Sequence, residues 1–381
     1  MKVVFYCNYL NHHQVLIADE LYRLLGDDYR FVATLPRNEK ELKGGLDYSL
    51  RPYCLLAGES EVARDEAMRL AREAEVCVFG ACSQEYTVER ARQSKCGLSF
   101  EMGERWLKRG WVNVFSPHLL KWWVNYVRYY HRRSFYKLCA SAFTASDDRN
   151  LLAYRGRHYK WGYFTAVDEE YKVEAPELGV STFEITPHIM WCSRFLKLKH
   201  PELPIRMAAS LKSKGYRFVL DMYGSGEEED TTKQLAHDLG VEDVAHFHGA
   251  LPNAEILQAM RQHDIFLFTS DRYEGWGAVA NEAMANGCVL VASDAIGSTP
   301  YLIKEGVNGL SFASESVEAL TERVEWLINH PEQLQTMRHG ALFTMQEIWS
   351  PAKAASALLH LVDDLQHGRQ SSLVEGPCSK A

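Results

Sequence analysis

The chain has 381 residues, of which 46% are hydrophobic and 24% charged, an ordinary balance for a globular protein of about two domains. Its formal net charge of -8 argues against a general nucleic-acid binder, because such proteins concentrate basic residues on one surface. The nine cysteines form no Cys-x-x-Cys pair and lie mostly in apolar runs, which indicates reduced thiols in a cytoplasmic protein. The first apolar run is too short for a signal sequence, and no stretch has the roughly 18 uncharged residues of a membrane span.

Short apolar runs alternate with helical patterns in the first half of the chain, which predicts parallel βαβ units. Predicted strands cover 3–7, 29–35, 54–58, 76–81, 98–102 and 141–146. Predicted helices cover 13–25, 61–74 and 83–94, and another begins at the Ser/Asp sequence near 146.

Residues 166–187 lose this rhythm and are rich in glutamate and proline, so they are the predicted linker. A second α/β series follows, with predicted strands at 188–194, 217–224, 244–249, 264–270 and 288–293 and helices at 202–213, 230–239, 253–261, in AVANEAMANG and after Pro300. The expected fold is α/β, with doubly wound domains at 1–165 and 188–350 that face each other across a ligand cleft. Residues 351–381 are expected to form a crossing helix at about 351–366 and a loose tail.

Charged residues of the second domain fall where a parallel sheet presents its binding edge. Arg194 ends one predicted strand, Lys199 follows it, Gly224 ends the next, and Glu274 follows a later one. Two cations beside a helix N-terminus and glycine amides favour a diphosphate, because these groups attract negative charge. Carboxylates accept hydrogen bonds from vicinal hydroxyls, so Glu274 and Glu282 indicate a sugar and a ribose.

These residues resemble the Glu-x7-Glu motif of retaining GT-B glycosyltransferases of the group 1 type, which use nucleotide sugars. The resemblance is strong over residues 188–312 and runs in the family's order through SRFLKLK, YGSGEEED, VAHFHG, EGWGAVANEAMANG, SDAIGSTP and KEGVNG. The first half is similar only in its α/β layout, and in this family that half binds acceptors.

The resemblance implies catalytic roles for Arg194 and Lys199 at the diphosphate and for Glu274 at the donor-sugar hydroxyls. It implies ribose binding by Glu282. The remaining donor contacts it implies are the amides of Gly275, Trp276 and Gly277, with Gly224 and His248 against the nucleoside. Such enzymes are thought to react by front-face displacement in which the leaving diphosphate assists deprotonation of the acceptor, so neither a metal nor a cofactor is expected.

The chain departs from the family's pattern at four places. Ser193 stands where glycine is frequent, Trp276 replaces phenylalanine, and Tyr301 replaces glutamate. The first loop, NYLNHHQ, lacks the usual glycine pair. These changes leave the acceptor and donor-sugar contacts open.

Other side chains permit two readings each. His13 and its neighbour His12 follow the first strand, and Glu101 follows another. Each of them has either a structural role in its loop or a role in substrate contact. His246 and His248 alternate on one predicted strand, but no cysteine or acidic residue accompanies them at ligand spacing. A structural or nucleoside-facing role is therefore favoured over a metal site.

The segment 118–137, HLLKWWVNYVRYYHRRSFYK, repeats basic residues at helical spacing beside an apolar face. One reading is a packed helix with a basic outer stripe. The more specific hypothesis is an interfacial patch that contacts anionic lipid or a lipid-linked sugar.

The sequence therefore predicts a cytoplasmic retaining glycosyltransferase, with peripheral contact at the inner membrane face if the more specific hypothesis holds. It would move a sugar from a UDP-sugar, or from GDP-mannose, to a saccharide or lipid-linked saccharide in bacterial surface-polysaccharide biosynthesis. A nucleotide-sugar epimerase of the same fold and a non-catalytic sugar-nucleotide binding protein are the alternatives.

Overall fold

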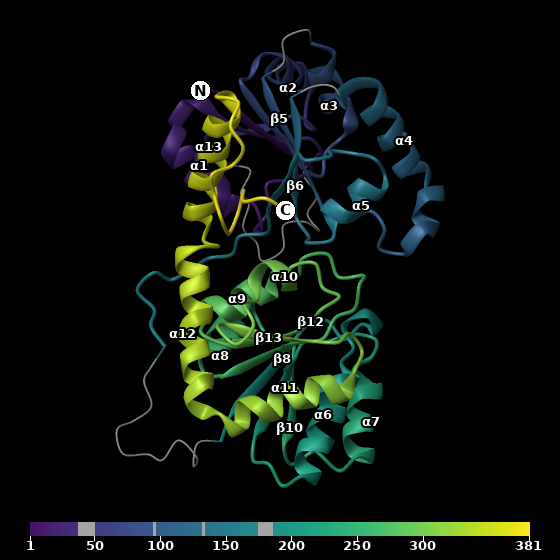
Figure 1. The fold of residues 1–381 in the computed structure, drawn as a ribbon, viewed down its shortest axis with the longest axis vertical. Coiled ribbons are helices and arrows are strands. Elements are labelled where there is room, and N and C mark those ends of the chain that lie inside the picture. The colour runs from purple at the N-terminus through teal and green to yellow at the C-terminus, as the bar shows by residue number, and fades with distance from the viewer. Residues whose placement is uncertain (37–49, 94–96, 132–133, 174–185) are drawn as a thin grey trace. The chain divides into compact units, whose positions relative to one another are not determined.

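The computed structural model describes residues 1–36, 50–93, 97–131, 134–173 and 186–381. The chain divides into two compact units, and each is described by itself (Figure 1). Unit 1 comprises Met1–Thr165 and Trp349–Ala381, and unit 2 comprises Ala166–Ile348. Residues 166–173 of the predicted linker thus belong to unit 2, and 174–185 lie outside the described residues.

Unit 1 is built on a seven-stranded parallel sheet with the strand order β3-β2-β1-β4-β5-β6-β7. Its strands are β1 (Val3–Cys7), β2 (Tyr29–Ala33), β3 (Cys54–Leu56), β4 (Val76–Phe79), β5 (Leu98–Gly103), β6 (Phe135–Cys139) and β7 (His158–Lys160). Its longer helices are α1 (Val15–Leu25), α2 (Glu61–Glu73), α3 (Gln84–Arg92), α4 (Pro117–Asn125), α5 (Thr144–Asn150) and α13 (Pro351–Gln366). The runs VVFYC and VCVF are buried throughout, as expected for strands covered on both faces.

The prediction was wrong in the last part of the first half. The expected strand at 141–146 is not formed; the strand is β6 at Phe135–Cys139, and Thr144–Asn150 form α5. The segment 118–137 is helical only through α4 and one π-helical turn, Tyr126–Tyr130. The basic, aromatic character of this segment concealed the strand, whose Lys137 is buried beside a carboxylate that neutralises it.

Unit 2 is built on a six-stranded parallel sheet with the order β10-β9-β8-β11-β12-β13. Its strands are β8 (His188–Cys192), β9 (Val219–Tyr223), β10 (Ala245–Gly249), β11 (Ile265–Phe268), β12 (Val289–Ser293) and β13 (Gly309–Phe312). Its longer helices are α6 (Glu202–Ser213), α7 (Glu229–Asp238), α8 (Asn253–Arg261), α9 (Val279–Ala285), α11 (Val317–Asn329) and α12 (Pro331–Glu347). The predicted strands of this half are confirmed, with ends shifted by a few residues.

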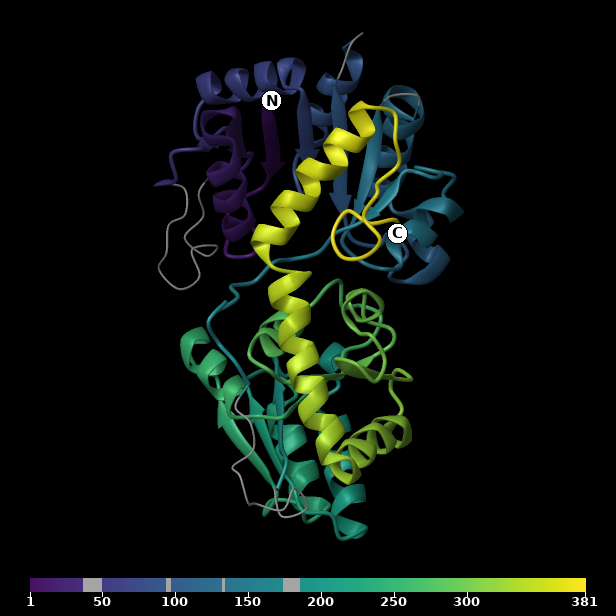
Figure 2. The same cartoon turned by 60° about the vertical axis from the view of Figure 1, so that its left-hand side comes forward.

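The end of the chain belongs to unit 1, where α13 packs beside α1 (Figures 1 and 2). The Ser350 hydroxyl caps α13 by accepting the Lys353 amide at 3.3 Å. The expected loose tail after the helix was wrong. The Lys160 amide donates to the Ser379 carbonyl and the Cys378 amide donates to the Lys160 carbonyl, and both tail residues are buried.

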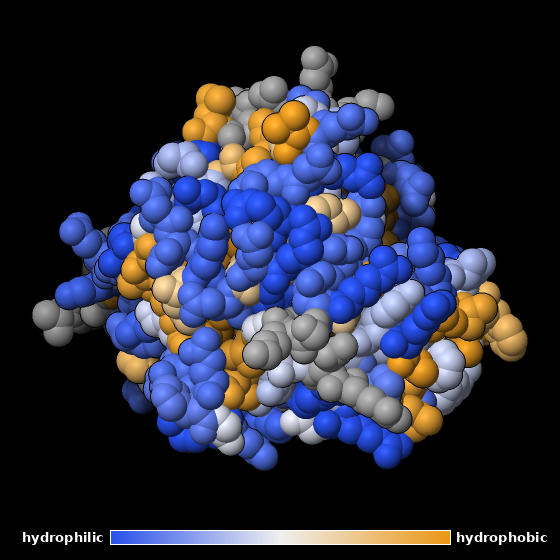
Figure 3. All heavy atoms as spheres, turned by 90° about the horizontal axis from the view of Figure 1, so that it is seen from above, coloured by the Kyte–Doolittle hydropathy of each residue, from blue (hydrophilic) through white to orange (hydrophobic). Residues whose placement is uncertain are grey.

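The surface of the chain is polar over most of the face seen in Figure 3, where apolar side chains form small separate groups. In contrast, several large apolar side chains between Trp111 and Val127 are exposed. None of the described helices has the length and apolar character needed to cross a membrane.

Candidate functional site

The candidate donor site of unit 2 lies at the carboxyl ends of four neighbouring strands. In the order β10-β9-β8-β11 these strands run parallel, so the loops that follow them leave from one edge of the sheet. Such an edge is where ligands bind in open α/β sheets. The structure thereby brings together the loops that hold Arg194, Lys199, Gly224 and Glu274 with the end of β10, which holds His248.

Two loops of this edge touch through their main chains. The Phe195 amide donates to the Ser225 carbonyl at 2.9 Å, and the Glu228 amide donates to the Phe195 carbonyl at 3.0 Å. Gly224 has φ +125°, and a Cβ atom there would lie 1.8 Å from the Ser193 carbonyl oxygen. Gly224 is therefore required by backbone contact as well as by its left-handed conformation.

The two predicted cations differ in their surroundings. Arg194 is exposed, and its guanidinium makes no hydrogen bond or ion pair within the described part of the chain. Lys199 is 12% exposed and forms a close ion pair with Glu274, which is 14% exposed. The Ser270 hydroxyl also donates to Glu274, at 3.0 Å. Arg194 is thus available to an anion, whereas Lys199 already has a carboxylate partner.

The turn from Glu274 to Gly277 is fixed by packing. Trp276 is fully buried, and its indole N–H donates to the Asn281 side chain at 2.7 Å. Gly277 has φ +74°, and a Cβ atom would lie 2.2 Å from the Phe268 ring. Because the Trp276 side chain is buried, this residue can contact a ligand only through its main-chain amide.

Glu282 lies in the first turn of α9 with largely buried residues on either side. Burial raises the pKa of its carboxyl to about 7, against a smaller lowering by a hydrogen bond from Asn253. The nearby Glu282 carboxylate adds to the burial that raises the pKa of the Cys192 thiol to about 12. The pKa of this carboxyl is thus close to ordinary pH. A ligand that donates hydrogen bonds to the ionised carboxylate stabilises that form, so ligand binding and ionisation of Glu282 favour each other.

His248 is held by a carboxylate of the adjacent strand. Its Nε2 lies 2.6 Å from Asp221 Oδ1, and Nε2 of His263 lies 3.0 Å from Asp221 Oδ2. Burial opposes ionisation of Asp221, but these hydrogen bonds outweigh it and lower the pKa of the carboxyl to about 2. This acidic partner comes from a separate strand, so the spacing of residues around His248 in the sequence did not reveal it.

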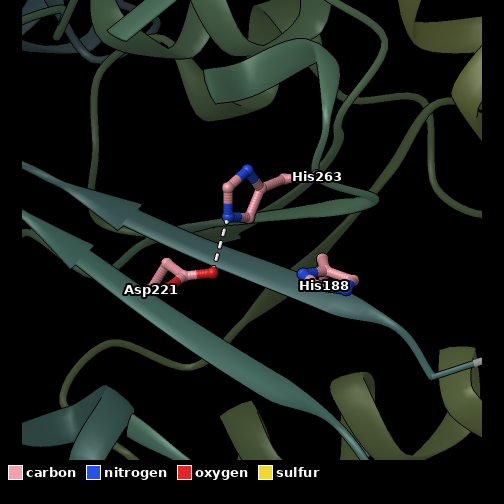
Figure 4. A group of neighbouring side chains, drawn as sticks. All are labelled: His188, Asp221 and His263. Carbon is pink, nitrogen blue, oxygen red and sulfur yellow. Dashed lines mark hydrogen bonds and ion pairs between the residues drawn. The ribbon is translucent and has the colours of Figure 1, made fainter. Parts of the chain in front are cut away.

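His188, Asp221 and His263 form the group among the described residues whose ligand atoms could meet at a metal ion (Figure 4). These atoms lie within 4.8 Å of one another. Nδ1 of His263 donates to the Ala259 carbonyl at 2.6 Å, so Nε2 is the nitrogen that faces Asp221. Both ring nitrogens of His263 therefore already have partners within the protein, the Ala259 carbonyl and the Asp221 carboxylate.

Unit 1 has a cavity of about 530 Å³ at the ends of β4, β5 and β6. Glu101 lines it and accepts three hydrogen bonds, from Trp122 at 2.7 Å, Lys137 at 2.9 Å and Tyr154 at 2.8 Å. His13 stacks on Tyr163, another residue of the wall, with ring centroids 5.4 Å apart. The structure thus places Glu101 in the wall of this cavity and His13 beside it, with the Glu101 carboxylate largely occupied by its own neighbours.

Three residues of these sites were not predicted. Ser270 binds Glu274, Asn253 contacts Glu282, and Asp221 orients His248. Asp221 is the one that the sequence could have revealed, because a carboxylate within the strand-forming run RFVLDMYG requires a buried partner.

Residues 183–341 match the model of the family described as glycosyl transferases group 1. The matched residues lie within unit 2 and contain the donor-site loops and α9, so the resemblance predicted from the sequence is confirmed there. A curated relative from Corynebacterium aurimucosum, "D-inositol 3-phosphate glycosyltransferase", is 30% identical over 185 residues, which are 47% of this chain and 43% of the relative. The GtfA subunit of a UDP-N-acetylglucosamine–peptide N-acetylglucosaminyltransferase from Streptococcus gordonii is 26% identical over 175 residues, 44% of this chain and 31% of that protein. The alignments span less than half the length of these relatives.

Solved structures agree with the fold of nearly the whole chain. Anabaena Alr3699/HepE in complex with UDP has a TM-score of 0.68 at 16% identity, with 95% of this chain and 100% of that chain covered. Sucrose-phosphate synthase from Thermosynechococcus elongatus has a TM-score of 0.64 at 14% identity, with 97% and 100% covered. The fold is therefore GT-B, with two parallel-sheet α/β domains.

Proposed function

We propose that the protein is a retaining glycosyltransferase that moves a sugar from a nucleotide diphosphate sugar to a saccharide hydroxyl. The observation that carries the proposal is the meeting of the Arg194, Lys199, Glu274 and Gly224 loops at one sheet edge, within the stretch that matches the family model.

Each donor-site residue is assigned to one part of the nucleotide sugar. Arg194, which has no protein partner among the described residues, supplies the donor fork for the diphosphate, and Lys199 turns to it from Glu274. Glu274, released in this way, accepts hydroxyl groups of the sugar, and Glu282 accepts those of the ribose. UDP-sugar is the preferred donor class. Two similar proteins support this donor class: Anabaena Alr3699/HepE was solved in complex with UDP, and the GtfA relative belongs to a UDP-N-acetylglucosamine–peptide N-acetylglucosaminyltransferase.

The transfer step needs no covalent intermediate on the protein. The acceptor oxygen attacks the anomeric carbon on the face from which the diphosphate leaves, so one C–O bond forms as the C–O bond to phosphate breaks. The acceptor proton passes to the departing phosphate oxygen. Arg194 and Lys199 stabilise the charge that develops there, the role a metal ion serves elsewhere, so transfer proceeds without a metal or cofactor.

The acceptor is assigned to unit 1, whose cavity holds Glu101. The proposed acceptor is a saccharide or lipid-linked saccharide, and the proposed role is bacterial surface-polysaccharide biosynthesis. One solved structure of similar fold, with a TM-score of 0.57, is that of WaaG, a glycosyltransferase involved in lipopolysaccharide biosynthesis.

Peripheral contact with an anionic membrane is proposed for the surface of Arg109, Trp111, Phe115, Lys121 and Arg128, called here the 109–128 surface. Phe115 is 87% exposed and Trp111 63% exposed. Residues 105–131 contain no Asp or Glu, although the whole chain has a net charge of -8. Exposed apolar rings among unopposed cations are typical of an interface with anionic lipid. The sequence predicted this contact for the segment 118–137, but Trp122 of that segment is buried and donates to Glu101 instead.

The proposed function is tested by incubating the protein with a panel of nucleotide sugars, with and without saccharide acceptors, and measuring nucleotide release and product in the presence of EDTA. Acceptor-dependent release of a nucleoside diphosphate, with retention at the anomeric carbon, is expected. Conversion of the sugar nucleotide without an acceptor would identify an epimerase. Tight binding without turnover for any acceptor would identify a binding protein, and loss of activity in EDTA would overturn metal independence.

A further inference from the structure

His200 directly follows Lys199 and has a backbone conformation that is unusual for a residue with a side chain. Its φ is +50° and its ψ is +57°, in the left-handed region. Glycine or asparagine is usual there, because a Cβ atom crowds the backbone in this conformation. A histidine at this position therefore depends on the surrounding contacts to hold it in place.

Both nitrogens of the His200 ring face carboxylates. Nδ1 lies 2.8 Å from Oε1 of Glu202, the first residue of α6. Nε2 lies 3.5 Å from Oδ2 of Asp271, which follows β11 in the chain. Nε2 is buried and has no hydrogen-bond partner among the described residues, so the Asp271 carboxylate is the charged group that it faces.

This arrangement requires a proton on each ring nitrogen. An ionised carboxylate only accepts hydrogen bonds, whereas a neutral imidazole has one nitrogen that donates and one that accepts. A neutral ring with its proton on Nδ1, toward Glu202, would direct the lone pair of Nε2 at the Asp271 carboxylate, and the two would repel each other. The imidazolium of His200 donates from both nitrogens, so both carboxylates attract it.

The charged groups around the ring act in the same direction. The hydrogen bond with Glu202 raises the pKa of His200 above its ordinary value of 6.5, and burial opposes this rise. The negative charges of Glu202, of Asp271 and of Glu315, which lies between β13 and α11, also raise this pKa. The elements that surround His200 thus favour its protonated form.

Asp271 connects this ring to the ion pair of Lys199 and Glu274. The Asp271 amide donates to the Leu198 carbonyl at 3.0 Å, and the Asp271 carbonyl accepts the Glu274 amide at 3.1 Å. His200 therefore makes a second side-chain contact between the same two loops that the Lys199–Glu274 pair joins. When a donor separates that ion pair, the contact of His200 with Asp271 still holds the two loops together.

We propose that the His200 imidazolium is a positioning residue of the donor site, which ties the Lys199 loop to the Glu274 loop through Asp271. Loss of its proton releases this tie, so sugar transfer depends on the charge of a residue that does not touch the donor. The effect on transfer rests on the proposed function, whereas the pairing of His200 with Asp271 does not.

The kinetic test compares His200→Asn with the wild type, because asparagine tolerates the left-handed conformation but carries no charge. The measurement is kcat at saturating donor between pH 6 and pH 9, and the ratio of wild type to variant cancels the titration of other groups. The ratio is expected to be about tenfold at pH 6, where misplaced loops slow the variant alone. It should fall to about twofold or less at pH 9, where the wild-type ring is neutral as well.

Asp271→Asn tests the other partner of the contact. It removes the charge but keeps an oxygen that can accept the Tyr273 amide, as Asp271 Oδ1 does at 2.8 Å. The variant should lower kcat at pH 6 as His200→Asn does. The double variant should be no slower than either single variant, because all three remove one contact.

His237→Asn is the matched control. His237 forms a similar pair with Glu242, at 3.0 Å, but it is an exposed residue in the last turn of α7. This variant should keep the wild-type kcat at every pH. Circular dichroism of each variant verifies that it is folded.

A readout that needs no catalysis is the NMR titration of the histidine rings in the full chain. The pKa of His200 is expected above 6.5 in the wild type and lower in Asp271→Asn, because that variant removes one of the charges that attract the imidazolium. The pKa of His237 should be the same in both proteins.

Three results would overturn the inference: wild-type kcat in His200→Asn at pH 6, a loss of kcat that is equal at pH 6 and pH 9, or a His200 pKa that Asp271→Asn leaves unchanged. The first two are scored on a wild type that transfers sugar, so they leave the proposed function standing. A wild type that binds no nucleotide sugar would instead contradict the proposed function and the positioning role together, and the titration would still decide whether His200 pairs with Asp271.

Discussion

Lys199 and Glu274 form an ion pair although 75 residues separate them in the chain, and each side chain is only about one-eighth exposed. The opposite charges of these two residues, which we assign to the donor site, are thus paired within the protein. When the donor binds, Lys199 can form an ion pair with the diphosphate while the sugar hydroxyls donate hydrogen bonds to Glu274. The Lys199–Glu274 contact is then replaced by one contact to the ligand from each residue.

Removing the lysine should therefore affect turnover more than folding. Lys199→Ala is expected to lower kcat by about a hundredfold to a thousandfold, because it removes a charge that stabilises the leaving group. The measurement is nucleotide release at saturating donor, alongside the circular dichroism spectrum. Lys197→Ala is the control and should retain its activity, since Lys197 is an exposed lysine of the same loop whose ammonium group makes no ion pair within the described chain. Near-normal turnover in Lys199→Ala would contradict the proposed role.

Glu282 should make donor binding depend on pH. Its carboxyl has a pKa of about 7 because it is buried, and ribose hydroxyls bind its ionised form better. The affinity for UDP-glucose, whose diphosphate does not titrate near pH 7, should rise as the pH increases from 6 to 8, with proton uptake by the buffer below pH 7. Isothermal titration in buffers of different ionisation enthalpy measures both. Glu282→Gln should abolish the pH dependence of UDP-glucose affinity. If the variant keeps the pH profile of the wild type, Glu282 is not the titrating group.

The same carboxyl gives a prediction for stability with the opposite sign. The pKa in the folded state is above the ordinary value of 4.5, so the contribution of the protonated group to the free energy of unfolding is complete below about pH 4.5 and is lost as the pH rises through 7. The loss is on the order of 3 kcal/mol. Urea unfolding at several pH values, compared between the wild type and Glu282→Gln, measures it. The difference between the two proteins should widen in favour of the variant as the pH rises.

Gly224→Ala should damage the donor edge by steric contact. The added Cβ would lie 1.8 Å from the Ser193 carbonyl oxygen, so the two loops must separate. Gly240→Ala is a matched control, since Gly240 also has a left-handed φ, +62°, but nothing lies within 4 Å of the position its Cβ would take. Gly240→Ala should cost about 1 kcal/mol in urea unfolding. Gly224→Ala should cost more and should also weaken UDP-glucose binding; equal effects would show that conformation alone, and not the loop contact, requires the glycine.

The 109–128 surface predicts salt-sensitive binding to liposomes that contain anionic lipid. Replacement of Trp111 and Phe115 by serine should reduce flotation with such liposomes, because both rings are exposed and would enter the interface. Phe343→Ser is a control, since Phe343 is also 59% exposed but lies on α12. Equal flotation of the double variant and the wild type would remove the membrane from the proposed partners.

Local sequence determined much of this protein. Short buried runs such as VVFYC specify strands because they must be covered on both faces, and GSG and GWG mark turns that only glycine allows. The spacing of Glu274 and Glu282, together with the cations, the glycines and the ordered motifs around them, indicated a sugar-nucleotide site.

Contacts between distant segments decided the rest. The pairing of Lys199 with Glu274, the Asp221 carboxylate beside His248, and the docking of Cys378 on β7 join residues whose separation in the chain carries no periodic signal. Strand β6 was hidden for the same reason: its Lys137 is tolerated inside the sheet only because Glu101, from another strand, neutralises it. Sequence patterns report which groups are present, whereas the burial and charge that give them their chemistry arise from packing.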